Sequence, residues 1–147
     1  MTIYKNIILA IDLHPHYDEY VAEKAYAFSQ MLNAKLYLMH AIEPLNTFGV
    51  TQGYEIIMRV EKEIADNARI EMKKLALKHN IPEDQQIIIT GSPEEVILEQ
   101  VKKRNVDLII VGTRGRHGLK LLLGSVADGL IHKATCDVLA IHTEDKS

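Results

Sequence analysis

The most informative part of the sequence is VDLIIVGTRGRHGLKLLLGS, residues 106–125. It begins with an apolar, β-branched run, which is typical of a strand buried on both faces of a parallel sheet. From Gly112 to Ser125 it carries four glycines together with Arg114, Arg116 and Lys120. Glycines in a loop either form tight turns or let the backbone approach a ligand, because they have no Cβ. The cationic side chains favour the second interpretation, with a negatively charged ligand.

On both sides of this stretch, short apolar runs alternate with longer segments whose apolar residues recur at helical spacing. Alternation of this kind predicts an α/β fold of one domain, residues 1–147. We expect a doubly wound, five-stranded parallel sheet, Rossmann-like, with helices on both faces. The expected strands are residues 6–12, 34–41, 85–90, 106–112 and 136–142, and the expected helices are residues 17–33, 54–79, 93–104 and 125–133.

Composition narrows the classes of function. The chain has 147 residues, 47% of them hydrophobic and 25% charged, which suits the core of one globular domain. A net charge of −3 argues against a nucleic-acid-binding protein, which usually has a basic face. No apolar run reaches the roughly 18 residues that a membrane span needs, and the N-terminus lacks the features of a signal peptide. We therefore expect a soluble, cytoplasmic protein that binds neither nucleic acid nor membranes.

The ends of two predicted strands carry the candidate site. In doubly wound sheets, ligands bind at the carboxyl ends of the strands, near the point where the strand order reverses. Asp12 ends the first predicted strand and Gly112 ends the fourth, so the two would flank one crevice if these strands are neighbours. Gly124 and Ser125 then open a helix, whose N-terminus attracts phosphate. A carboxylate for ribose hydroxyls and a glycine loop for phosphates together suit a nucleotide.

Each of these features also has a structural alternative. The four glycines could serve turns alone, Ser125 could be a helix N-cap, and Asp12 could cap a helix or a turn. The glycine spacing matches neither the P-loop nor the dinucleotide-binding fingerprint. By itself, the spacing is therefore a weak indication of any particular ligand.

Three stretches of the chain, KNIILAID (5–12), LYLMHAIEP (36–44) and residues 91–142, resemble the universal stress protein family. The resemblance covers almost the whole chain and implies a homodimer of adenine nucleotide alpha hydrolase-like fold. One branch of the family binds ATP through the pattern G-x2-G-x9-G-[ST], and another lacks these glycines and binds ATP poorly. This chain has Gly112-x2-Gly115-x8-Gly124-Ser125, which keeps the glycines and the serine in a loop one residue shorter.

The resemblance also implies roles for individual residues. Asp12 would bind the ribose beside Ala10, and Ala41 would offer backbone hydrogen bonds to adenine. Val111 and Gly112 would border adenine and ribose. The ligand would be ATP, ADP or AMP, accompanied by Mg²⁺ or Mn²⁺. The phosphates would be held by Gly115, Gly124, Ser125 and Val126, with Arg114, Arg116 and His117 as further candidate contacts in the same loop.

The last predicted strand is the expected dimer interface. By the resemblance, it would pair antiparallel with the same strand of a second subunit. An apolar strand with an open edge invites such pairing, and the alternative is an edge covered by the C-terminal tail. The residues of this strand are Asp137, Val138, Leu139, Ala140 and Ile141.

Three functions compete at this point. The leading hypothesis is a stress-response regulatory protein that binds an adenine nucleotide and acts as a homodimer. The second is an interaction module of the branch that binds no nucleotide, which the shorter loop supports. The third is an enzyme with at most weak ATP hydrolysis, although no catalytic triad is visible. The histidines show no metal-ligand spacing, so no metal site made by the protein alone is expected.

Overall fold

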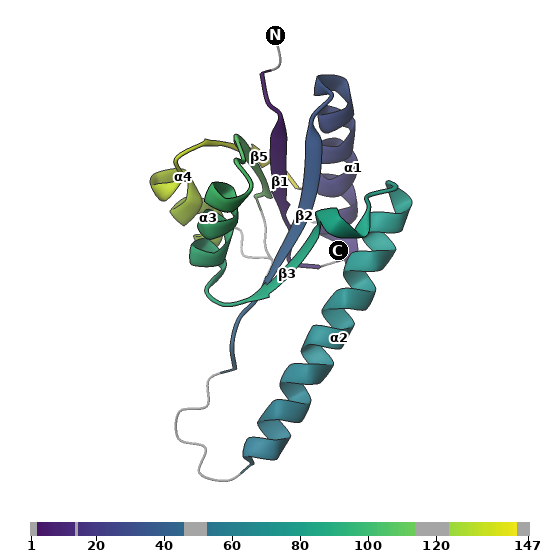
Figure 1. Cartoon of the computed structure of the whole chain (residues 1–147), viewed down its shortest axis with the longest axis vertical. Coiled ribbons are helices and arrows are strands. Elements are labelled where there is room, and N and C mark those ends of the chain that lie inside the picture. Colours follow the sequence, from purple (N-terminus) through teal and green to yellow (C-terminus); the bar gives the residue numbers. More distant parts are fainter. Residues whose placement is uncertain (1–2, 14, 46–52, 114–123, 144–147) are drawn as a thin grey trace.

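Five parallel strands form one sheet in the order β3–β2–β1–β4–β5 (Figure 1). The computed structural model describes residues 3–13, 15–45, 53–113 and 124–143. The prediction of a doubly wound, five-stranded parallel sheet is confirmed. The strands are β1 (Asn6–Ala10), β2 (Lys35–Ile42), β3 (Gln86–Thr90), β4 (Leu108–Gly112) and β5 (Asp137–Ile141).

Helices cover both faces of this sheet. One face lies under α1 and α2, and the other lies under α3 and α4 (Figure 1). Each connection between consecutive strands runs through a helix, as parallel pairing requires. The helices are α1 (Pro15–Leu32), α2 (Tyr54–Lys78), α3 (Pro93–Lys103) and α4 (Ser125–Lys133), and a short 3-10 helix, η1 (Glu83–Gln85), precedes β3.

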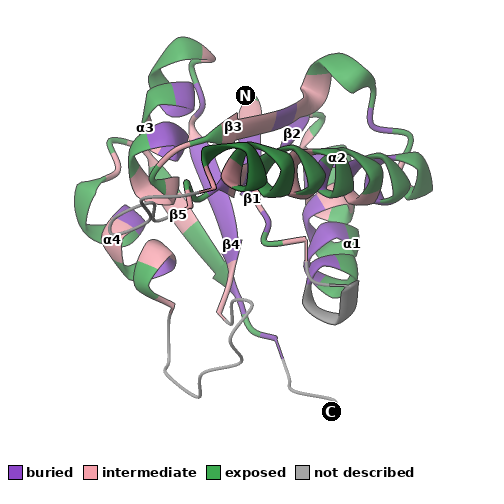
Figure 2. Cartoon of the chain, turned by 90° about the horizontal axis from the view of Figure 1, so that it is seen from below, coloured by how far each residue is buried: buried purple, intermediate pink, exposed green. Residues whose placement is uncertain are grey.

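The central strands are buried on both faces because their residues are apolar without interruption (Figure 2). Successive side chains of a strand point to opposite faces. Ile7 and Leu9 of β1 therefore join the core under α1 and α2, while Ile8 joins the core under α3 and α4. All three are fully buried. The continuous apolar runs of the sequence thus correctly predicted strands that are covered on both sides.

The strand order reverses at β1. The chain proceeds from β1 to β2 and β3 on one side, then crosses to β4 and β5 on the other. As a result β1 pairs with β4 as well as with β2, with Ile7 opposite Leu108 and Leu9 opposite Ile110. The first and fourth strands are neighbours, which is the condition under which Asp12 and Gly112 would flank one crevice. Their carboxyl ends meet where sheets of this type bind ligands.

Several boundaries differ from the predicted ones. β1 ends at Ala10 rather than at Asp12, because the chain turns away through Leu13, which has a positive φ of 61°. β4 begins at Leu108 rather than at residue 106. The preceding Asp107 instead uses its carboxylate to accept hydrogen bonds from the backbone N–H groups at positions 5 and 6. α1 begins at Pro15, two residues earlier than expected, and proline is favoured in the first turn of a helix.

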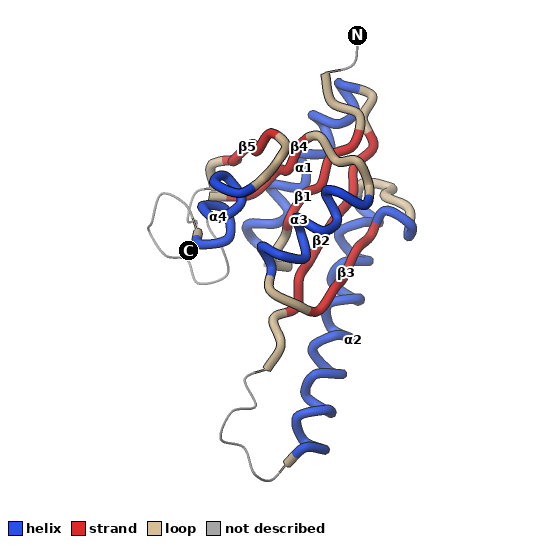
Figure 3. Tube along the Cα trace, turned by 60° about the vertical axis from the view of Figure 1, so that its left-hand side comes forward, coloured by secondary structure: helices blue, strands red, loops and turns tan. Residues whose placement is uncertain are grey.

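α2 is the long amphipathic helix that the sequence predicts, but it packs on the sheet only through its C-terminal half. Its N-terminal half extends past the edge formed by the carboxyl ends of the strands (Figures 1 and 3). Tyr54, Ile56 and Met58 are exposed there. Within the described ranges, no helix combines the length and the apolar character that crossing a membrane requires. The buried residues of α2 are Ala68, Met72, Leu75 and Ala76.

Gly91, which directly follows β3, provides a test of packing at this edge. Its N–H donates to the carbonyl of Ile42, 2.9 Å away, and a Cβ on Gly91 would lie 2.6 Å from Cγ1 of the buried Val96. We expect Gly91→Ala to lower the free energy of unfolding by about 1–3 kcal/mol, because the branched Val96 side chain must shift within a packed core. Urea denaturation measures this loss.

The matched control for Gly91→Ala is Ser92→Ala. Ser92 is exposed and occupies the N-cap of α3 without a side-chain capping bond. Its replacement should change the free energy of unfolding by less than about 0.5 kcal/mol. Equal stability of the two variants would show that the Gly91 position tolerates a Cβ.

Candidate functional site

Four of the predicted nucleotide-binding residues lie against the same core of the described structure. Ala10, Ala41, Val111 and Val126 come from β1, β2, β4 and α4, yet all four belong to or pack against the core under α3 and α4. Gly112 is the last residue of β4. We call this group the strand-end site, and we include in it three further residues, one on the β1–α1 connection and two at the start of α4. These are Asp12, Gly124 and Ser125.

Asp12 lies on the connection from β1 to α1. It is exposed, and it stands between Ile11, which is buried, and Leu13, which is half-buried. The N–H of Ile11 donates to the carbonyl of Met39 at 2.9 Å, and the carbonyl of Ile11 lies 2.8 Å from Nδ1 of His40. Both backbone groups of the residue before Asp12 are therefore bonded to β2.

Thr113 fixes the chain where it leaves β4. Its N–H donates to the carbonyl of Ile141, 2.9 Å away, and its hydroxyl oxygen accepts the N–H of Thr143 at 3.1 Å. The two threonine hydroxyls are 3.4 Å apart. Thr143 is almost completely buried. The residue after Gly112 is thus joined to the end of β5.

α4 begins one residue earlier than an N-cap at Ser125 would require. Gly124 occupies the N-cap with φ −67° and ψ 162°, and Ser125 is the first helical residue. The interpretation of Ser125 as an N-cap is therefore wrong, because the boundary lies one position earlier. Ser125 is exposed. Its hydroxyl stands at the N-terminus of α4, where the partial positive charge of the helix favours an anion.

Gly124 has no structural need to be glycine in the described part of the chain. Its φ is one that every residue adopts readily. At the position a Cβ would take, no described atom lies within 4 Å. Among the described atoms, none blocks the space beside the N-terminus of α4, so a ligand could approach this backbone closely.

The remaining predicted phosphate contacts fall outside the described residues. They are Arg114, Gly115, Arg116 and His117. In the ranges that are described, no cluster of three or more His, Cys, Asp or Glu side chains could hold a metal ion. A divalent ion at the strand-end site would consequently need ligands from outside this set, such as the oxygens of a bound phosphate chain.

The predicted dimer strand coincides with β5, which is the last strand of the sheet. Its residues pair with β4 on one side only, from Asp137 opposite Leu108 to Ile141 opposite Gly112. Since the carbonyl of Ile141 bonds to Thr113 and thus faces β4, the backbone groups of alternate residues face the other way. Val138 and Ala140 therefore direct their N–H and C=O groups toward the open edge.

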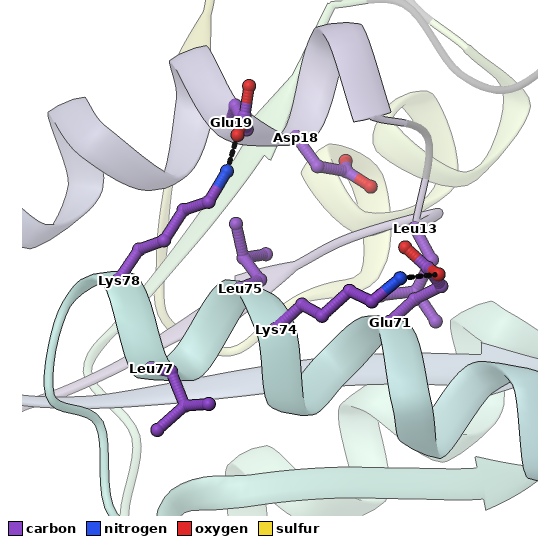
Figure 4. Close-up of a pocket in the computed structure, with 8 residues that line it drawn as sticks. All are labelled: Leu13, Asp18, Glu19, Glu71, Lys74, Leu75, Leu77 and Lys78. Carbon is purple, nitrogen blue, oxygen red and sulfur yellow. Dashed lines mark hydrogen bonds and ion pairs between the residues drawn. The ribbon is translucent and has the colours of Figure 1, made fainter.

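A cavity of about 380 Å³ lies between α1 and α2, on the opposite face of the sheet from the residues packed under α3 and α4. Figure 4 shows Lys78 of α2 reaching Glu19 of α1 across it, and Lys74 bonded to Glu71 on α2. No pattern in the sequence predicts this α1–α2 cavity. One of its lining residues, Leu13, directly follows Asp12 of the strand-end site. The residues lining it are Leu13, Asp18, Glu19, Glu71, Lys74, Leu75, Leu77 and Lys78.

Two further features of the strand-end region were missed from the sequence. His40 is buried, and the sequence feature that could have identified it is its place as the single polar residue in the apolar run LYLMHAI. The contact of Thr113 with Thr143 had no local signal, because it joins residues 30 positions apart.

Cys136 is half-buried, and burial raises the pKa of its thiol, which disfavours the reactive thiolate.

The fold and the strand-end site define a doubly wound α/β protein whose candidate site lies at the switch point of its sheet. Residues 3–142 match the model of the universal stress protein family, and the chain belongs to that family. It is 43% identical over 141 residues to universal stress protein A homolog 2 of Coxiella burnetii (strain RSA 493 / Nine Mile phase I), covering 96% of this chain and 97% of that protein.

Solved structures share the fold. The chain superposes with a TM-score of 0.81 on hypothetical protein MJ0577, at 26% identity, covering 98% of this chain and 99% of that one. A universal stress protein solved in complex with cAMP gives a TM-score of 0.60 at 23% identity, covering 96% and 98% of the two chains. The second likeness shows the fold alone.

The Thr113 contacts lead to a stability prediction. Thr113→Val keeps the shape of the side chain but leaves the N–H of Thr143 without the hydroxyl acceptor that it has at 3.1 Å. We expect a loss of about 1–3 kcal/mol in the free energy of unfolding, the usual cost of an unsatisfied buried donor. Urea denaturation measures it, and Thr90→Val, at an exposed residue of β3, is the control. If both variants are as stable as the parent chain, the contact contributes nothing.

Proposed function

We propose that this protein binds an adenine nucleotide at the strand-end site and acts as a regulatory protein of the stress response. Gly124 is the observation that carries the proposal. Neither its φ of −67° nor the described atoms around it require glycine at the start of α4. A phosphate that approaches the helix N-terminus would require glycine, because a Cβ would occupy the space that the phosphate needs.

The other site residues fit the parts of a nucleotide. Asp12 is exposed beyond β1 and would accept hydrogen bonds from ribose hydroxyls. Ala10 and Ala41 are small and half-buried, which leaves room for a base beside backbone groups of β2. Gly112 and Val111 would border the base and ribose from β4. Gly124, Ser125 and Val126 would bind the phosphates through backbone N–H groups and the Ser125 hydroxyl.

The comparisons support an adenine nucleotide as the ligand class. A universal stress protein of the same fold was solved in complex with cAMP, whose base is adenine. ATP and AMP are the forms to compare, because the glycine loop of this chain is one residue shorter than the ATP-binding pattern. Mg²⁺ or Mn²⁺ would enter with the phosphates, since the described side chains offer no metal cluster of their own.

Two other functions remain distinct from this proposal. An interaction module without nucleotide would fit the shorter loop, and in it Gly124 would serve only as the N-cap of α4. A weak ATPase would use the same site, and it would show as ADP that accumulates with time.

A titration tests the proposed ligand. We expect ATP with Mg²⁺, or AMP, to bind saturably with one nucleotide per subunit in isothermal calorimetry. Gly124→Asn should weaken the affinity at least about tenfold, because its side chain fills the open space while remaining a favoured N-cap. Absence of heat and of any thermal shift at millimolar nucleotide would contradict the proposal and assign the chain to the interaction modules.

The matched control for Gly124→Asn is Gly53→Asn. Gly53 is the N-cap of α2 and has a left-handed conformation with φ 105°, which asparagine tolerates better than most residues. The control makes the same substitution at another helix start. It should bind nucleotide like the parent chain.

We also propose that two copies pair antiparallel through β5. The backbone groups of Val138 and Ala140 face the open edge, and Leu139 and Ala140 are exposed. An open edge with exposed apolar residues favours pairing with a second strand. The proposed assembly is therefore a homodimer with a sheet that continues across the two subunits.

Ala140→Pro tests this assembly. Proline removes the N–H of Ala140, which faces the open edge, and leaves the bonds of β5 to β4 in place. In light scattering after size exclusion, we expect twice the mass of the 16.6 kDa chain for the parent protein and a single 16.6 kDa chain for the variant. Ala140→Ser keeps the N–H and should stay dimeric. A dimeric Ala140→Pro variant, or a monomeric parent chain, would rule out pairing through this edge.

A further inference from the structure

We infer that His40 is a positioning residue for the strand-end site: its imidazole holds the peptide that leads into Asp12. The inference rests on the proposed function for its consequence, because Asp12 is the residue proposed to bind ribose. The contact itself is a property of the fold. His40 is 7% exposed, lies in β2, and has Nδ1 2.8 Å from the carbonyl oxygen of Ile11.

The chemistry of this contact determines which atom donates. A carbonyl oxygen can only accept a hydrogen bond, so Nδ1 of His40 carries the hydrogen and donates it. Because His40 is buried, water competes little for either group. Removing the donor would leave the Ile11 carbonyl without this bond, which is costly for a buried polar group.

His40 takes the place of a backbone donor at the end of the β1–β2 pairing. The register of these strands ends with Ala10 opposite Met39, followed by the bond from the N–H of Ile11 to the carbonyl of Met39. If the pairing continued, the N–H of Ala41 would donate next to the carbonyl of Ile11. The imidazole supplies a donor to that carbonyl instead. The strands can then separate, and Ala41, whose backbone is proposed to meet the base, lies at the point of separation.

The bond acts on Asp12 through the peptide plane. The carbonyl of Ile11 and the N–H of Asp12 belong to one rigid, planar unit. Fixing that carbonyl on His40, with the Ile11 N–H fixed on Met39, therefore sets the orientation in which the chain enters Asp12.

Two substitutions separate the donor from the bulk of the side chain. His40→Asn keeps an N–H donor at the same number of bonds from the backbone as Nδ1, whereas His40→Leu fills the site with an apolar group. The control is Gln100→Leu in α3. Gln100 is also 7% exposed, and it accepts a hydrogen bond from Arg104 at 2.8 Å on a different element.

The first measurement needs no nucleotide. Amide hydrogen exchange of residues 11–13 should accelerate about tenfold or more in His40→Leu, because the peptide loses its anchor. It should stay close to the parent rate in His40→Asn and in Gln100→Leu. Parent-like exchange at these amides in His40→Leu would overturn the inference, whatever the chain binds.

The second measurement is the Kd for ATP and AMP in the same variants. We expect His40→Leu to bind about tenfold more weakly than the parent, His40→Asn to recover most of the affinity, and Gln100→Leu to bind like the parent. Equal weakening in His40→Leu and Gln100→Leu would overturn the inference, since it would report a general loss of stability. If the parent chain binds no nucleotide, the proposed function fails, and the exchange result alone decides whether His40 holds this peptide.

Discussion

The parallel pairing of β1 with both β2 and β4 determines how the other strands and helices are arranged. Because β1 is central, the chain builds the sheet outward in two directions. Right-handed crossovers then place α1 and α2 on one face and α3 and α4 on the other. The adjacent residues Ile7, Ile8 and Leu9 supply both cores at once. The same pairing leaves the carboxyl ends of β1 and β4 side by side, with their connections leaving toward opposite faces.

That edge is ordered by hydrogen bonds made just past the ends of the strands. The backbone groups just past the strand ends still need hydrogen-bond partners; two of them find these on the neighbouring strand and one on a side chain. The carbonyl of Ile11 accepts from His40, the N–H of Gly91 donates to Ile42, and the N–H of Thr113 donates to Ile141. The connections that leave β1, β3 and β4 are each held in this way within a residue of the strand end. A ligand at this edge therefore meets backbone whose position the sheet already determines.

The sequence predicted the sheet and the location of the candidate site because both follow from regular patterns. Continuous apolar runs identified β1 and β4, and their parallel direction placed Asp12 and Gly112 at one edge. The end of β1 was misjudged, because apolar residues continue to Ile11 while the regular pairing stops at Ala10. Glycine and serine are both good N-caps, so composition could not show that Gly124 rather than Ser125 precedes α4. The bond of His40 to Ile11 spans 29 positions and depends on the register of two strands, which no local pattern encodes.

Thr113 connects the strand-end site with the open edge of the sheet. It follows Gly112 directly, and it bonds to Ile141 and Thr143 at the end of β5. A ligand that restrains the backbone after Gly112 consequently also restrains the last residues of β5. In the proposed dimer, pairing through β5 restrains Thr113 in return. Such coupling is reciprocal by thermodynamic necessity: if a nucleotide strengthens the dimer, dimer formation strengthens nucleotide binding by the same factor. A sheet of this design can therefore transmit occupancy of the site to the subunit interface through one short, hydrogen-bonded segment.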